Sequence, residues 1–287
     1  MRHFTEEEIE FVKKNLENEI PKDRLCKQIM KIDSRTFRRM CKEVGINYPT
    51  FYRRKIHRNP FVDLSNPDVM YWLGWLATDG YVSLEETRVR LSLSVHDIDV
   101  IEKFQQFVSP KLTIHHSIHH KKFEMVTVSF RNKEITSYLH ELGFKENKTF
   151  TFVPNFKITW DYIRGVFEGD GYLRRKEVNI TGASKLHIEA ICNFVKSCGI
   201  RCAIRTKTTP QGTTMYDFEI NNKEGINQFL DNIYKDANTF MNRKYYNARA
   251  IRNNSWKDPK FGEPASGIPS QASVEEGVTT LQDPLST

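Results

Sequence analysis

The chain has 287 residues, of which 39% are hydrophobic and 28% charged, so it can bury at least one substantial core and a wholly disordered chain is excluded. No stretch approaches the roughly 18 uninterrupted apolar residues of a membrane span, and the start lacks the apolar core of a signal peptide. Five cysteines without a CxxC pair are typical of reduced thiols. We therefore expect a cytoplasmic protein with no membrane partner. Lysine and arginine (43) exceed aspartate and glutamate (36), which gives a net charge of +7 and favours a polyanionic partner.

Residues 1–48 are predicted to form a small all-α domain of three helices. Thr5 caps the first helix, Pro21 begins the second, and Asp33 or Ser34 caps the third, which ends at Gly45. This layout resembles a helix-turn-helix, whose second helix enters the major groove of DNA, although a small helical domain with a solvated basic face gives the same pattern. The residues of the third helix that we predict to contact DNA are Arg35, Arg38, Arg39 and Lys42.

Residues 49–65 are predicted to form a basic linker. From Pro21 to Pro60 there are twelve lysines and arginines against three acidic residues. The linker contains both basic and aromatic residues, which is typical of a segment that follows phosphates, so we predict that Arg53 and Arg54 contact DNA.

An internal duplication occupies residues 71–247. The twelve residues from Tyr71 to Val82 align without gaps to those from Tyr162 to Leu173, with five identities at an offset of 91 residues, and two later blocks repeat in the same order. Each copy predicts the order helix, strand, strand, helix, strand, strand, helix. Polar residues alternate along the strands, so each sheet is expected to expose one face.

Small residues recur four positions apart on each motif helix, Gly74 with Thr78 and Gly165 with Gly169. This spacing places them on one helix face, where small side chains let two helix backbones approach closely. We therefore expect the two motif helices to pack against each other.

Glycines are expected to end both motif helices, Gly80 after Asp79 and Gly171 after Asp170. The two carboxylates would then lie side by side at the negative ends of two helix dipoles, which is electrostatically unfavourable. A divalent cation such as Mg²⁺ relieves that repulsion, and such a pair of sites suits metal-assisted hydrolysis of a phosphodiester.

These two motifs resemble the paired LAGLIDADG motifs of homing endonucleases, over the chain from Asn66 to about Tyr246. The resemblance implies an α+β fold in which two pseudo-symmetric αββαββα repeats, residues 66–155 and 156–256, form a saddle on double-stranded DNA. It also implies a monomer that makes a double-strand break in a long asymmetric target with Mg²⁺, for which Mn²⁺ can substitute.

By the same resemblance, Asp79 and Asp170 are catalytic residues that bind the metal, and the main-chain carbonyls of Thr78 and Gly169 are further ligands. Each active site of the family also uses a basic residue just after the last helix of the repeat. In this chain Lys148 and Lys244 occupy that position, where they would stabilise charge on the phosphate or position the attacking water.

Two departures from the family pattern make the halves unequal. Ala77 and Glu168 occupy a motif position that is often acidic, so Glu168 is expected to alter the affinity for metal beside it. Val95 and Gly182 stand where some members place a polar residue that organises water. We therefore expect one DNA strand to be cut more slowly.

The strands carry the remaining predicted contacts. A histidine-rich run, residues 114–120, is interpreted as a DNA-facing or solvated strand rather than a zinc site, because alternate strand positions point in opposite directions. The strand residues predicted to contact DNA are Arg88, Arg90, Ser92, Arg174, Arg175, Arg205 and Lys207.

Two other functions use the same fold: a transcription regulator that binds DNA without cutting it, and a maturase that binds intron RNA. Both acids are present, which favours cleavage but leaves a dual role open. An intein origin is disfavoured because the sequence lacks the terminal residues of splicing. We expect a mobile gene, within an intron or between genes, of bacterial or phage origin, with an organelle as the open alternative. Residues 257–287, with two lysines against five acidic residues, are predicted to be a disordered tail.

Overall fold

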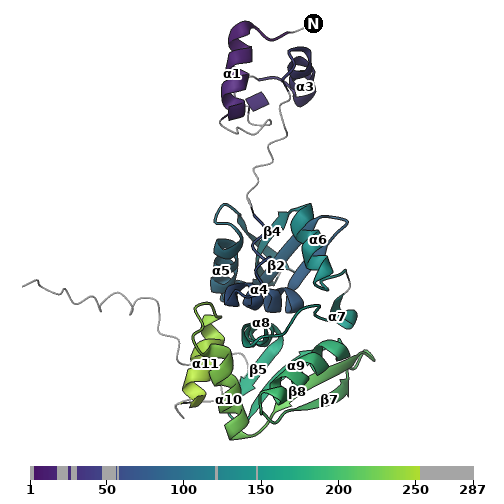
Figure 1. The fold of residues 1–287 in the computed structure, drawn as a ribbon, viewed down its shortest axis with the longest axis vertical. Coiled ribbons are helices and arrows are strands. Elements are labelled where there is room, and N and C mark those ends of the chain that lie inside the picture. Colours follow the sequence, from purple (N-terminus) through teal and green to yellow (C-terminus); the bar gives the residue numbers. More distant parts are fainter. Residues whose placement is uncertain are drawn as a thin grey trace, which may run out of the picture. The chain divides into compact units, whose positions relative to one another are not determined.

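The computed structural model describes residues 3–17, 25–26, 31–46, 56, 58–119, 122–146 and 148–252. The chain divides into two compact units, Met1–Arg58 and Asn59–Thr287 (Figure 1). Arg53, Arg54, most of the helix predicted from Pro21, and the predicted tail lie outside the described residues. Within the described part of the chain, no helix is long and apolar enough to cross a membrane.

The smaller unit has its own apolar core between two described helices, α1 (Glu6–Glu17) and α3 (Ser34–Glu43). The ring of Phe4 packs edge-on against that of Phe37, with 5.8 Å between their centroids. The buried residues of this core are Phe4, Val12, Leu25, Cys26, Phe37, Met40, Cys41 and Ile46.

Both described helices begin at the predicted caps. The Thr5 hydroxyl accepts from the Glu8 N–H while the Glu8 carboxylate accepts from the Thr5 N–H, a reciprocal pair that satisfies two otherwise unpaired donors. The Asp33 carboxylate accepts from two N–H groups in the first turn of α3. Gly45, at φ +70°, follows the end of that helix as predicted.

The larger unit contains two copies of one arrangement, which confirms the predicted order of elements. The first comprises α4 (Pro67–Thr78), β1 (Gly80–Ser83), β2 (Arg88–Ser94), the 3₁₀ turn η2 (Val95–Asp97), α5 (Ile98–Val108), β3 (Ile114–His119), β4 (Phe123–Arg131) and α6 (Lys133–Glu141). The second comprises α8 (Trp160–Asp170), β5 (Gly171–Arg174), β6 (Glu177–Gly182), α9 (Lys185–Ser197), β7 (Ala203–Thr208), β8 (Thr214–Ile220) and α10 (Lys223–Tyr234). The short helix α7 (Lys148–Thr151) lies between the copies, and α11 (Asn242–Arg252) follows the second.

Each copy forms an antiparallel four-stranded sheet, in the order β1-β2-β4-β3 and β5-β6-β8-β7. Along β2, Val89 and Leu91 are buried while Arg90 between them is exposed. One face of the first sheet therefore packs on the core and the other is polar and accessible, as the alternation predicted.

The motif helices α4 and α8 pack against each other at glycines, which confirms the expected close approach (Figure 1). A Cβ added to Gly74 would lie 2.8 Å from the Gly165 Cα, and one added to Gly165 would lie 3.0 Å from the Gly74 Cα. Any side chain at either position would push the two backbones apart, so this contact fixes how the repeats meet.

The glycines that follow the motif helices serve a purpose other than the expected one. Gly80 is not among the residues with positive φ, and Gly171 has φ −88°, so neither provides a left-handed helix end. Instead, a Cβ on Gly80 would lie 2.5 Å from the Leu76 Cα, and one on Gly171 would lie 2.6 Å from the Phe167 carbonyl oxygen. Lack of space above the last turn excludes a side chain.

Part of the predicted linker belongs to the larger unit. Phe61 is fully buried, and its ring lies edge-on to Phe107, with 5.4 Å between centroids. The Asn59 side chain accepts from the Phe61 N–H and fixes the local turn. Burial of a single aromatic ring holds this segment against α5.

Replacing Gly74 by alanine should destabilise the larger unit by about 1–3 kcal/mol, because the added methyl group meets backbone that cannot move aside. Helix propensity alone predicts that alanine stabilises the helix by about 1 kcal/mol, so a measured loss of stability cannot come from propensity and reports the steric clash. Urea unfolding followed by tryptophan fluorescence measures it, since Trp72, Trp75 and Trp160 all lie on α4 and α8.

Gly182→Ala is the matched control for this substitution. Its nearest neighbours are side-chain carbons of Ile188, at 3.1 and 3.2 Å, which can shift. A Gly74→Ala variant as stable as Gly182→Ala would contradict the proposed role of the helix contact.

Candidate active site and nucleic-acid interface

Two carboxylates meet where the motif helices end. Asp79 is the C-cap of α4 and Asp170 is the last residue of α8. A Cβ built on Gly169 would lie 2.9 Å from the Asp79 Oδ2, so the carboxylate of one repeat sits against the backbone of the other. The structure thus brings the two predicted acids together.

The surroundings disfavour the charged form of both acids. Burial raises the pKa of Asp79, and burial together with the negative charge of Asp79 raises the pKa of Asp170 to about 6. Each residue remains open to solvent on one side, which weakens these effects. A cation placed between them would favour both charged forms.

Lys148, at the start of α7, binds the C-terminal end of α4. Its ammonium group donates to the carbonyl oxygens of Ala77 and Thr78, at 3.1 and 3.4 Å. Burial lowers the pKa of Lys148, while the charges of Asp170 and Asp79 act in the opposite direction. A positive charge at the negative end of a helix dipole stabilises the helix end.

Lys244, on α11, closes the end of α8 in the same way. Its ammonium group donates to the carbonyl oxygens of Phe167, Gly171 and Gly169, at 2.8, 2.5 and 3.5 Å. Burial, with a contribution from the nearby Arg243 charge, lowers the pKa of Lys244 to about 8. The two predicted lysines therefore occupy equivalent places beside the two acids.

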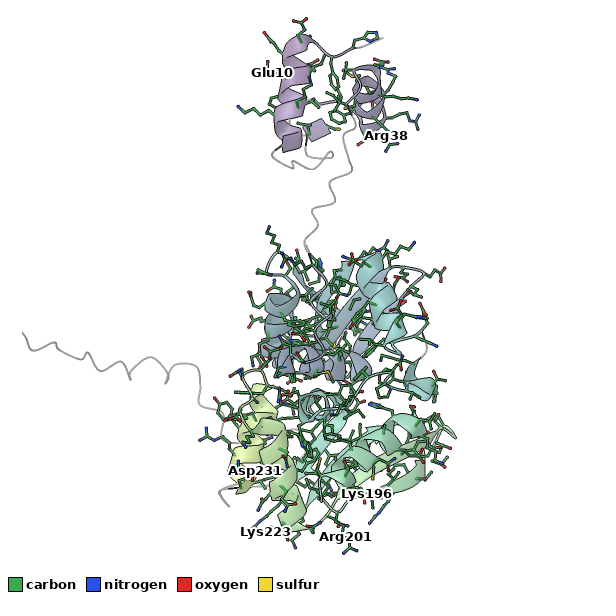
Figure 2. All side chains as sticks on the ribbon, viewed as in Figure 1. Glu10, Arg38, Lys196, Arg201, Lys223 and Asp231 are labelled. Atoms are coloured by element: carbon green, nitrogen blue, oxygen red, sulfur yellow. The ribbon has the colours of Figure 1, made fainter. Side chains whose placement is uncertain are left out.

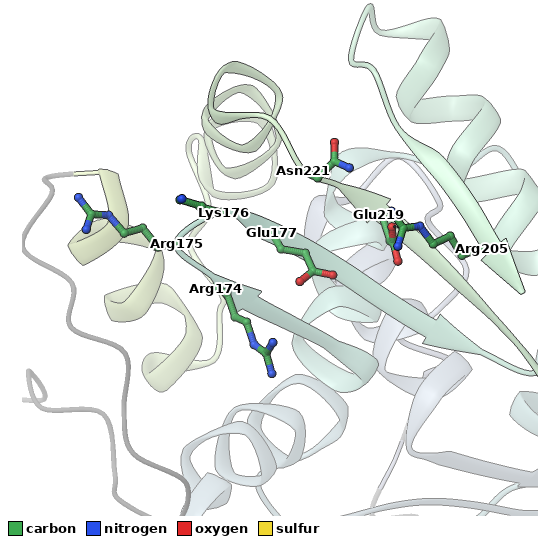
Figure 3. Close-up of a pocket in the computed structure, with 7 residues that line it drawn as sticks. All are labelled: Arg174, Arg175, Lys176, Glu177, Arg205, Glu219 and Asn221. Carbon is green, nitrogen blue, oxygen red and sulfur yellow. Dashed lines mark ion pairs between the residues drawn. The ribbon is translucent and has the colours of Figure 1, made fainter. Parts of the chain in front are cut away.

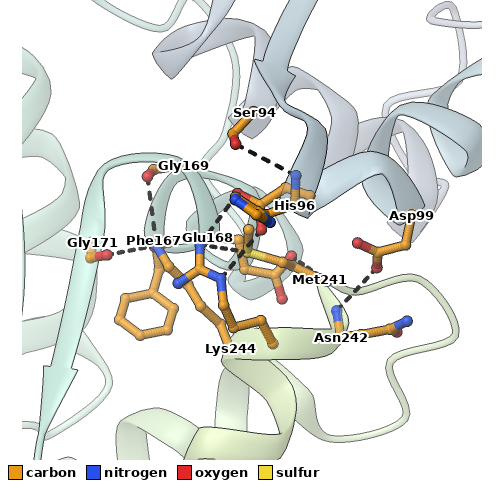
Figure 4. Close-up of polar contacts among 12 residues, drawn as sticks. Ser94, His96, Asp99, Phe167, Glu168, Gly169, Gly171, Met241, Asn242 and Lys244 are labelled. Atoms are coloured by element: carbon orange, nitrogen blue, oxygen red, sulfur yellow. Dashed lines mark hydrogen bonds and ion pairs between the residues drawn. The ribbon is translucent and has the colours of Figure 1, made fainter. Parts of the chain in front are cut away.

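The start of α11 is held by the first repeat through contacts that sequence spacing did not indicate (Figure 4). The Asp97 carboxylate accepts two bonds from the Arg243 guanidinium, each at 3.2 Å. Lys103 pairs with Asp99 at 2.9 Å and donates to the side-chain oxygen of Asn242 at 3.0 Å. Asn242 lies 139 residues from Lys103 and Arg243 lies 146 residues from Asp97 in the chain, so only the folded structure reveals these two contacts.

Asp97 is also an electrostatic neighbour of the site. Its charge adds to the factors that raise the pKa of Asp79. It lies two residues beyond Val95, the position at which a water-organising polar residue is missing. A carboxylate is therefore present near that position, and its partner is Arg243.

Glu168 does not lie beside the metal position as expected. Its Oε2 accepts from the Tyr71 hydroxyl at 2.6 Å and, beside Met241 (Figure 4), from the Met241 N–H at 2.8 Å; the residue is 1% exposed. Residues two apart on a helix point to nearly opposite sides, so Glu168 faces the core while Asp170 faces the site. Burial raises the pKa of Glu168 to about 7.

The site offers the oxygen donors that Mg²⁺ prefers: two carboxylates and two main-chain carbonyls, those of Thr78 and Gly169. Each carbonyl keeps a second lone pair beside its long contact with lysine. Across the described ranges, no three His, Cys, Asp or Glu side chains gather as metal ligands. The residues present fit a cation whose remaining ligands come from water or a bound phosphate.

Basic residues line the polar faces of both sheets, as predicted. In the first, Arg90 is exposed with its guanidinium 4.7 Å from the centre of the Tyr81 ring, Arg88 pairs with Glu86 at 3.0 Å, and Ser92 bonds Thr127 at 2.8 Å. In the second, a hollow at one end of the sheet gathers cations (Figure 3). It is lined by Arg174, Arg175, Lys176, Glu177, Arg205, Glu219 and Asn221.

The other predicted contacts lie on exposed elements. The described histidines of β3, His115, His116 and His119, are exposed. On α3, Arg35, Arg38 (Figure 2) and Lys42 are exposed, whereas Arg39 pairs with Glu43 at 3.5 Å.

Comparison with known families gives a match to a LAGLIDADG-like domain over residues 66–146 and 160–234. The chain belongs to the LAGLIDADG-like domain family. The match covers both repeats and more than half of the chain, and it confirms the resemblance seen in the duplicated motifs.

Individual relatives of these LAGLIDADG repeats are distant. A glutamine–fructose-6-phosphate aminotransferase of Methanocaldococcus jannaschii is 24% identical over an alignment of 183 residues that covers 59% of this chain and only 16% of that protein. I-DmoI, crystallised with DNA and Ca, is 17% identical with a TM-score of 0.49, over 68% of this chain and all of that one. Full-length DUF199/WhiA from Thermatoga maritima is 13% identical with a TM-score of 0.45, over 70% and 66%.

Replacing Asp170 by asparagine should stabilise the metal-free protein at pH 7. The pKa of this carboxyl is raised in the folded state, so the proton it holds stabilises the fold at low pH, and this contribution is lost as pH rises through about 6. Asparagine removes that loss, a gain of at most about 1 kcal/mol after solvent screening. Urea unfolding at pH 4.5 and pH 7 should show the gain mainly at pH 7.

Glu102→Gln, which removes an exposed carboxylate from α5, is the control for the change in net charge. A stabilisation of equal size in both variants, or a larger gain at pH 4.5 than at pH 7, would contradict the electrostatic account.

Proposed function

We propose that this protein is a site-specific DNA endonuclease that makes a double-strand break in a long asymmetric target with a divalent cation, Mg²⁺ or Mn²⁺. The observation that carries the proposal is the pairing of Asp79 and Asp170 at two adjoining helix ends, each with its own lysine bound to the helix-end carbonyls. A site that is unfavourable to the fold on its own points to a ligand that compensates.

In this proposal the acids and the lysines have different roles. Asp79 and Asp170, with the carbonyls of Thr78 and Gly169, hold the cation; when bound, it supplies an activated water and polarises the phosphodiester. Lys148 and Lys244 donate from fixed positions towards charge that develops on the phosphate. Because their ammonium groups are held by carbonyls, little reorganisation is needed.

Double-stranded DNA is the proposed partner of the two polar sheet faces, whose arginines contact base edges and whose lysines contact phosphates. Helix α3, with Arg35, Arg38 and Lys42, is proposed to add a second contact of the helix-turn-helix kind. Since both acids belong to one chain, a monomer is proposed to cut both strands. Binding of intron RNA and a cytoplasmic location stay predictions.

The direct test incubates the purified chain with DNA from its own insertion locus, rejoined without the insert, with and without Mg²⁺. We expect cleavage that requires the metal. Asp79→Asn and Asp170→Asn should each reduce the rate at least about 100-fold, because each removes charge from the site at which the transition state is stabilised.

Glu102→Gln serves again as the control and should cut as fast as the unchanged chain. Tight binding without cutting in either Mg²⁺ or Mn²⁺ would reject the nuclease at that locus and favour a DNA-binding regulator. Loss of intron splicing on deletion of the gene would instead indicate a maturase.

A further inference from the structure

Two carboxylates lie at the centre of the polar face of the second sheet. Asp217 and Glu219 alternate on β8 with Phe218 and Ile220, which are buried on the opposite face. On a surface proposed to meet phosphates, bare carboxylates would repel the partner. Asp217 and Glu219 are only 8% and 9% exposed, so something covers them.

The cover comes from the neighbouring edge strand β7. The Nε of Arg205 lies 2.8 Å from the Oε2 of Glu219, with side chains 68% and 10% exposed. The Nζ of Lys207 lies 2.9 Å from the Oδ2 of Asp217, whose Oδ1 accepts from the Thr181 hydroxyl at 2.6 Å. Each carboxylate therefore lies beneath a cation that faces outward.

The contact with Glu219 determines how Arg205 is presented. The contact with Glu219 engages Nε rather than a terminal nitrogen, and the Arg205 side chain, drawn beside Glu219 in Figure 3, is 68% exposed. Two nitrogens of a planar guanidinium match the N7 and O6 of guanine in the major groove. A side chain held in this way also loses less conformational entropy when it binds.

The first sheet lacks this arrangement at the equivalent positions. Strand register places Glu219 opposite Asn179, and in the first repeat Ser129 opposite Arg90. It places Arg205 opposite Asp217, and the equivalent His115 opposite Thr127. The corresponding place in the first sheet thus has histidine, serine and threonine where the second has an arginine on a carboxylate.

We propose that Arg205, oriented by the positioning residue Glu219, determines specificity by reading a guanine in the half of the target that the second repeat contacts. The symmetry-related base pair, in the half of the target that the first repeat contacts, is not required to be a guanine. The proposal rests on the proposed function only in that the polar sheet faces contact DNA, and it does not require cleavage.

The test selects bound duplexes from a randomised pool with the full chain, without divalent metal, and sequences them. The unchanged chain should require guanine at one position of one half-site, by roughly 5- to 150-fold over other bases. Arg205→Lys keeps the charge but not the paired donors, so the preference should vanish while affinity for DNA is retained. Glu219→Gln should weaken the same preference and leave the other positions unchanged.

Arg175→Ala is the matched control, since Arg175 lines the same hollow but lies in the turn between β5 and β6. It should weaken binding to all sequences equally and reduce the slope of log binding constant against log salt concentration by about 1. Thermal unfolding of each variant shows that it folds.

A guanine preference that survives Arg205→Lys, or a pool without any base preference, overturns the inference and leaves the nuclease proposal standing. Absence of DNA binding overturns both. Conversely, failure to cleave combined with an Arg205-dependent preference rejects the nuclease alone.

Discussion

The close contact between α4 and α8 is the constraint on which the rest of the larger unit depends. Gly74 and Gly165 allow the backbones to meet because neither has a side chain to separate them. The two sheets are attached to these helices, so the helix contact sets how their polar faces are related. It also places Asp79 against Gly169, and therefore against the end of the other helix. A single packing requirement thus produces both the site and the frame for its partner.

That geometry has an electrostatic cost, which the structure offsets in part. Two carboxylates and two helix ends of negative polarity meet. Burial, together with the charge of Asp79, raises the pKa of Asp170 to about 6. Lys148 and Lys244 donate to carbonyl oxygens of the last helical turns and reduce the repulsion. The position of Lys244 depends in turn on the first repeat, because Asp97 binds the adjacent Arg243. The remaining imbalance is the physical reason to expect a cation.

The repeats share a backbone and differ in their polar side chains. Strand pairing is equivalent in the two sheets, yet Arg90 of the first lies on central strand β2 and Arg205 of the second lies on edge strand β7. Arg90 lies over the ring of Tyr81, whereas Arg205 is held by Glu219. Duplication followed by such divergence allows a symmetric frame to meet an asymmetric sequence. The core supports this freedom, since these residues project away from it.

Local spacing and duplication were sufficient for the sequence to determine the order of elements, the caps at Thr5 and Asp33, the glycine contact and the pairing of the two acids, because neighbouring or repeated residues specify each of them. The two lysines were predicted from the resemblance to the LAGLIDADG family. Tertiary structure alone decided the direction of Glu168, which follows from its place on the buried side of α8. It also decided the contacts that hold α11 and the carboxylates beneath the cations of β7. The residues in these contacts are brought together only by folding, and no spacing along the chain indicates that they pair.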